Sequence, residues 1–146
     1  MVAWKATLGA FAASALAGCG LLFDYDTATT AEREAWLAKV SHDLYDRLDE
    51  ALPHGEGGAV MSLRERNYDA NNRRVEMIVD ARFRGAQSRF DGYVTRRSIL
   101  EELCPDYLGS VLDRKGVAIV IRYALDGGGT LAAAKLTTRE CARYGN

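Results

Sequence analysis

A regular alternation of side chains between positions 75 and 83 constrains the fold of this chain more than any other feature. Five apolar residues stand at every second position: Val75, Met77, Val79, Ala81 and Phe83. Charged residues occupy the positions between them, and Ile78 is the one exception. Because successive side chains of a β-strand point to opposite faces, this pattern predicts a strand with one buried and one wet face.

Three further segments have the character of strands. The first, Ala59–Tyr68, precedes a turn at Asp69–Asn72 that leads into the alternating strand. The other two, Val117–Leu125 and Leu131–Thr138, flank Asp126–Gly129, whose consecutive glycines favour a hairpin turn. The sequence therefore predicts two pairs of neighbouring strands.

A helix is predicted before the first pair of strands. Its apolar residues recur at every fourth position: Trp36, Val40, Leu44 and Leu48. Thr29, with Glu32 three residues later, has the pattern of a capping box. Pro53 follows the last apolar residues, so we expect one amphipathic helix that starts after Thr29 and ends at Pro53.

A second helix is predicted between the two pairs of strands. Ser98, followed by Glu101, indicates its start, and the apolar residues from Ile99 to Leu112 follow helical spacing. Pro105 lacks an amide donor and should kink this helix or split it into two. Gly116 is expected to stop it.

The order of these elements, αββαββ, predicts the fold class. We expect a single α+β domain over residues 30–146, with two helices packed on one face of a four-stranded, mainly antiparallel sheet. The opposite face of the sheet should be wet. It should carry the charged residues of the alternating strand, namely Arg74, Glu76, Asp80, Arg82 and Arg84.

The first residues of the chain have the pattern of a secretion signal. Trp4 and Lys5 precede a mostly apolar run, Ala6–Ala15, and small residues follow it. This arrangement predicts a signal peptide over residues 1–18. A second interpretation stays open, because the 18 residues from Ala6 to Phe23 carry no charge and are just long enough for an uncleaved membrane span.

The sequence Leu16-Ala17-Gly18-Cys19 resembles the lipobox of bacterial lipoprotein precursors. The resemblance implies cleavage before Cys19, a diacylglyceryl group on its thiol and an acyl chain such as palmitate on the new amine. Residues 19–29 would then form a lipidated tether. Because Gly20, and not an aspartate, follows the cysteine, the resemblance favours the outer membrane, with the domain facing the periplasm.

With Cys19 lipidated, two cysteines remain in an exported protein. The simplest expectation is a disulfide between Cys104 and Cys141, and the alternative is two unrelated buried thiols.

The sequence favours neither an enzyme nor a metal or cofactor site. His42 and His54 are the only histidines, and neither has the spaced partners that a zinc site requires. No nucleophile motif is present. The net charge of −1 gives no global field for nucleic acid.

Arginines are concentrated between positions 64 and 97, a segment that contains nine arginines and five acidic residues. The candidates for contact with a partner or an anion are Arg74, Arg82, Arg84, Arg89, Arg96 and Arg97. A guanidinium group matches carboxylate or phosphate geometry. The alternative is that these arginines pair with Glu76, Asp80 and the acidic first helix.

These observations lead to two functional hypotheses. The first is a lipid-anchored, non-enzymatic envelope protein that binds a protein partner, as an assembly or accessory factor, through its open sheet face or an edge strand. The second is a binding module for a small or anionic envelope ligand.

Overall fold

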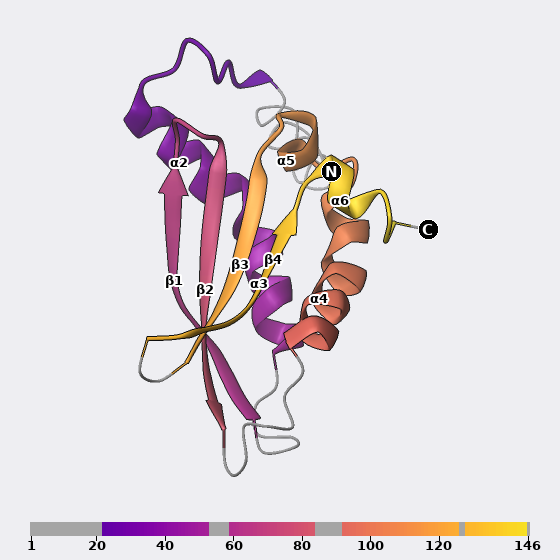
Figure 1. Ribbon diagram of the computed structural model, residues 1–146. Helices are drawn as coiled ribbons and strands as arrows, with labels where there is room; N and C mark the ends of the chain where they lie inside the picture. The colour runs from indigo at the N-terminus through magenta and orange to yellow at the C-terminus, as the bar shows by residue number, and fades with distance from the viewer. Residues whose placement is uncertain (1–21, 53–58, 84–91, 126–127, 146) are drawn as a thin grey trace, which may run out of the picture.

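The computed structural model of this protein describes residues 22–52, 59–83, 92–125 and 128–145 (Figure 1). The predicted signal peptide, Cys19, His54, Arg84 and Arg89 lie outside these residues. The elements along the chain are α2 (Thr30–Val40), α3 (His42–Ala51), β1 (Ala59–Asp69), β2 (Arg74–Phe83), α4 (Gly92–Tyr107), α5 (Val111–Arg114), β3 (Ala118–Leu125), β4 (Thr130–Leu136) and α6 (Thr138–Cys141).

The strands form one sheet in the order β1-β2-β3-β4. The two outer pairs, β1 with β2 and β3 with β4, are antiparallel, and the central pair is parallel. A parallel pair requires a crossover connection, and α4 and α5 lie in this one. The predicted α+β fold with a mainly antiparallel four-stranded sheet is therefore confirmed.

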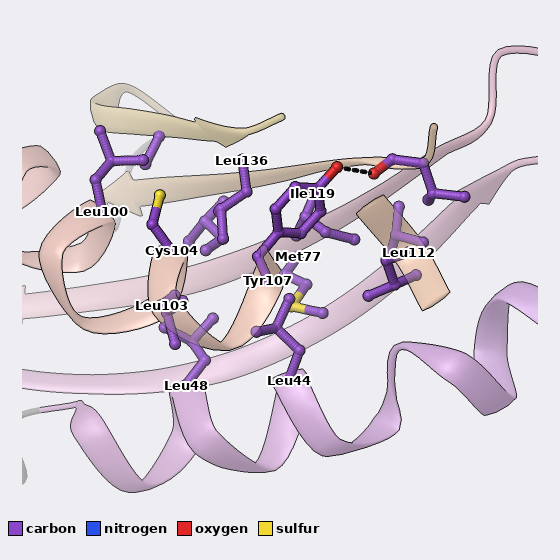
Figure 2. Close-up of a cluster of buried hydrophobic side chains, with 14 of the residues drawn as sticks. Leu44, Leu48, Met77, Leu100, Leu103, Cys104, Tyr107, Leu112, Ile119 and Leu136 are labelled. Carbon is purple, nitrogen blue, oxygen red and sulfur yellow. Dashed lines mark hydrogen bonds between the residues drawn. The ribbon is translucent and has the colours of Figure 1, made fainter. Parts of the chain in front are cut away.

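The helices α2, α3 and α4 lie on the same face of the sheet (Figure 1). The core between them is formed by one side chain from every second position of the strands and by the apolar stripes of the helices. Figure 2 shows Leu44 and Leu48 of α3 meeting Leu103 and Tyr107 of α4 above Met77 of β2. The buried hydroxyl of Tyr107 donates a hydrogen bond to the carbonyl oxygen of Val117, 2.8 Å away.

The first helix starts as its sequence predicts. The side chain of Thr29 accepts a hydrogen bond from the amide of Glu32, and Oε2 of Glu32 accepts one from the amide of Thr29, so the capping box is complete. The predicted single helix is divided at the buried Ser41 into α2 and α3. Hydrogen bonds of helical type still join the two, from the amide of Ser41 to the carbonyl oxygen of Leu37 and from the amide of Tyr45 to that of Ser41.

The second helical segment differs from its prediction at two points. It begins at Gly92, before the expected start at Ser98, and Glu101 accepts a hydrogen bond from Arg97 on the same helix. It also continues past Pro105, and the division falls at Gly109, whose positive φ of 75° ends α4. The expected stop at Gly116 is confirmed, since its φ is 66° and β3 follows directly.

Cys104 and Cys141 form a disulfide, as predicted. The bond joins α4 to the short helix α6 that follows β4. Thr137 caps α6 by accepting a hydrogen bond from the amide of Glu140. The disulfide therefore fixes the C-terminal end of the chain against the crossover helix.

The expected tether is wrong over residues 23–29. Tyr25 is only 4% exposed and belongs to the main core, and Phe23 packs against that core. The folded domain therefore includes Phe23 and Tyr25, which precede the expected boundary at residue 30. We call Phe23–Thr29 the N-terminal strap.

Candidate functional site

The face of the sheet opposite the helices carries the outward-pointing residues of all four strands, and we call it the open face. Its members are set by the alternation of each strand: Val60, Ser62, Arg64, Asn67 and Asp69 of β1, Arg74, Glu76, Ile78, Asp80 and Arg82 of β2, Ala118, Val120, Arg122 and Ala124 of β3, and Thr130, Ala133 and Lys135 of β4. No helix among the described residues lies over this face (Figure 1).

Three ion pairs cross the open face between neighbouring positions. Arg64 Nε lies 3.4 Å from Asp80 Oδ1, and Arg122 Nε lies 3.2 Å from Glu76 Oε1. At the end of the same strands, Arg74 NH2 lies 3.5 Å from Asp69 Oδ2. In each pair the arginine side chain is more exposed than the carboxylate, at 50% against 25% for Arg64 and Asp80. A molecule that approaches this face therefore meets guanidinium groups before carboxylates.

Ile78, the exception in the alternating strand, is buried on the open face. Its side chain is 2% exposed, yet it is not a member of the main core beneath the helices. In the strand register its neighbour on β3 is Arg122, and the ion-paired Glu76 and Asp80 lie two residues away on either side. Long arginine side chains cover apolar surface with their methylene stems. This explains how an isoleucine is shielded on a charged face.

Among the strands that the structure describes, β1 lies at one edge of the sheet and pairs with β2 alone. It is 11 residues long, and its register with β2 shifts between Leu63 and Glu65. A bulge of this kind increases the local twist and interrupts the row of free backbone groups that an edge strand presents. The flat face of the sheet is therefore a better docking surface than this edge.

The structure divides the predicted arginine cluster between two surfaces. Arg74 and Arg82 lie on the open face, at opposite ends of β2. Arg96 and Arg97 lie on α4, where Arg96 NH2 contacts Glu140 Oε1 at 2.8 Å. Arg97 contacts Glu101 Oε1 at 2.7 Å. These residues do not form one binding cluster.

Sequence reasoning missed three cations of the open face: Arg64, Arg122 and Lys135. Arg122 and Lys135 stand at the outward positions of their strands, so the alternation within β3 and β4 carried the signal. Arg64 had no such signal, because it lies inside the register shift of β1.

The N-terminal strap is the second candidate feature. The ring of Tyr25 lies 5.2 Å from the Cζ atom of Arg33 and 4.6 Å from that of Arg73, and its edge faces Trp36 at a centroid distance of 5.7 Å. Its hydroxyl donates a hydrogen bond of 2.6 Å to the carbonyl oxygen of Ala70. Burial raises the pKa of Tyr25, and the two guanidinium groups oppose that shift.

Three cations hold the strap, two through its backbone carbonyl oxygens and one through the side chain of Asp26. Arg33 Nε donates to the carbonyl oxygen of Tyr25 at 2.7 Å, and Lys115 Nζ donates to that of Phe23 at 3.0 Å. Arg73 pairs with Asp26 and donates to the carbonyl oxygen of Lys115 at 3.0 Å. Arg73 has a φ of 48°, a conformation uncommon for residues other than glycine. The strap is thus attached to the β1–β2 turn and to the residue after α5.

The described residues offer little that resembles catalytic or metal chemistry. Within them, no group of three or more His, Cys, Asp or Glu side chains is placed to hold a metal ion. His42 is an exposed residue of α3, with Nδ1 3.6 Å from Asp46 Oδ1.

No known protein family, curated protein or solved structure gives a significant match to this chain. In the part of the chain that the structure describes, no helix combines the length and apolar character needed to cross a bilayer.

The burial of Ile78 can be tested by truncation. Ile78→Ala should lower the free energy of unfolding by about 2 kcal/mol, because it removes buried apolar atoms and leaves a gap beneath the ion pairs. Val60→Ala is the matched control on the same face, and since Val60 is 36% exposed its effect should stay within about 0.5 kcal/mol. Urea denaturation followed by circular dichroism measures both. Equal, small effects would contradict the burial of Ile78.

Proposed function

We propose that this protein is a lipid-anchored protein of the bacterial cell envelope, without enzymatic activity, that binds a partner protein on the open face of its sheet. The partner is one with an acidic surface. The observation that carries the docking proposal is a sheet face over which no helix of the described residues lies, and on which Arg64, Arg82 and Lys135 are exposed and Arg122 is partly exposed.

Charge arrangement supports a protein as the occupant. The carboxylates of Asp80 and Glu76 hold Arg64 and Arg122 in place, so the guanidinium groups are ordered before a partner arrives. Complementary charge steers association and selects the partner, and ordered side chains lose less conformational entropy on binding. A small ligand would need a cavity that buries most of its surface, whereas these groups lie on the outside of a sheet.

The N-terminal sequence supports the anchor. Leu16-Ala17-Gly18-Cys19 places a cysteine directly after an apolar run and small residues, which is the arrangement that lipoprotein precursors share. The disulfide between Cys104 and Cys141 agrees with export, because such bonds form and persist in oxidising compartments. By the same resemblance, the anchor lies in the outer membrane and the domain faces the periplasm.

Photo-crosslinking in cells tests the docking face. A photoreactive residue at Ser62 or Lys135 should give one shared protein adduct, and the same residue at Arg139, exposed on α6, should not. The double variant Arg82→Glu with Lys135→Glu should reduce the adduct about tenfold. Lys39→Glu with Arg139→Glu makes the same change in net charge on exposed helical positions and should leave it unchanged. Equal adducts from all positions, or equal loss in both double variants, would refute the docking face.

Mass spectrometry tests the anchor. Protein extracted from membranes should lack residues 1–18 and carry the mass of a diacylglyceryl group on Cys19. Cys19→Ser should remove both the lipid and the cleavage, because a thiolate is the nucleophile that accepts the lipid. A mature wild-type chain that still begins at Met1 and carries no lipid would exclude this part of the proposal.

A further inference from the structure

The strap attaches the N-terminal end of the domain to one particular end of the sheet (Figure 1). Tyr25 bonds to Ala70 in the β1–β2 turn, and Phe23 bonds to Lys115 just before β3. The β1–β2 turn, α5 and the strap therefore lie together, and we call this the strap end of the domain. The opposite end of the sheet contains Val60 of β1, its neighbour Arg82 of β2 and Leu125 of β3.

The distance from Cys19 to the strap end is limited by covalent geometry. Four residue steps separate Cys19 from Phe23, and a fully extended chain advances at most about 3.5 Å per step. Phe23 therefore stays within about 14 Å of Cys19 whatever conformation the intervening residues adopt. Over the 11 residues of β1 the sheet extends for about 35 Å. A lipid on Cys19 thus keeps the strap end near the bilayer, whereas the length of the strands allows the other end to lie about 35 Å further away.

We infer that the strap end rests on the surface of the lipid bilayer into which the acyl chains of Cys19 insert, with the strands running away from the membrane. This inference rests on the proposed lipidation of Cys19.

The chemistry of the strap end suits a bilayer interface. Leu22 is 84% exposed and directly precedes the strap, so its side chain is available to the acyl boundary. Arg114 is an exposed cation of α5 and precedes Lys115, which bonds to Phe23 of the strap. A long basic side chain reaches lipid phosphates while its stem stays in apolar surroundings. Four acidic residues of this end have partners in the fold. Asp26 pairs with Arg73 and Asp69 with Arg74, Asp24 accepts from the amides of Asp26 and Thr27, and Asp113 accepts from Thr138 and from the amide of Gly109.

This placement also has a consequence for the open face. With the strands directed away from the bilayer, the guanidinium groups of the open face are accessible from the side and do not lie on the lipid. The alternative, in which this cationic face lies flat on anionic lipid, would bring Val60 and Arg82 to the surface as well.

Fluorescence quenching distinguishes these arrangements. Full-length lipidated protein is reconstituted into vesicles of phosphatidylethanolamine and phosphatidylglycerol that contain a lipid with a nitroxide on its headgroup. A fluorophore is placed on a cysteine at Asn71, in the β1–β2 turn, or at Val60, at the far end of the open face. Because Cys104 and Cys141 are bonded and Cys19 carries lipid, the introduced cysteine is the reactive thiol.

The label at Asn71 should be quenched several-fold more than the label at Val60. Insertion of roughly twelve Gly and Ser residues between Gly20 and Leu21 should abolish the difference, since such a segment adds about 20 Å of mean reach. Equal quenching at the two positions in protein that floats with the vesicles would overturn the inference and leave the anchor standing. Protein that does not float with the vesicles would overturn the anchor, and the inference with it.

Discussion

The contacts of Tyr25 fix the position of the proposed lipid anchor relative to the proposed docking face. Its ring lies near the guanidinium groups of Arg33 and Arg73, and its hydroxyl bonds to Ala70 in the β1–β2 turn. These contacts convert a segment that resembles a tether into part of the core. As a result Phe23 has a fixed place at one end of the domain, and under the proposed lipidation of Cys19 the four residue steps between them become an orientation constraint. Without the strap, an anchored domain would be free to present any face to the membrane.

The two faces of the sheet differ, so the orientation of the domain decides which face a partner can reach. All the long helices lie on one face, and the disulfide between Cys104 and Cys141 fixes α6 against α4 on that side. The other face carries ordered ion pairs with the arginines outermost. The arginines of the open face therefore have both a structural and a binding role. Their carboxylate partners neutralise part of the positive charge of this face and also hold the guanidinium groups in position.

Local patterns predicted most of the fold, and non-local contacts account for the parts that differ. The alternation from Val75 to Phe83 and the capping box at Thr29 each depend on neighbouring residues, and both are confirmed. The strap has no periodicity, and Tyr25 is buried by contacts with residues more than 40 positions later, so no local pattern reveals it. For the same reason, arginines close in sequence were expected to cluster, whereas the fold separates Arg82 from Arg96.

Docking of the strap at one end of the domain can be measured as a distance between the residue before the strap and α5. Spin labels on cysteines that replace Leu22 and Arg114, in a Cys19→Ser background, report the position of the strap relative to α5 by double electron–electron resonance. We expect a single narrow distribution of the distance between the two labels, and we expect it to broaden when Tyr25 is replaced by Ala. A broad distribution in the protein with Tyr25 intact, as a freely moving tail would give, would contradict it.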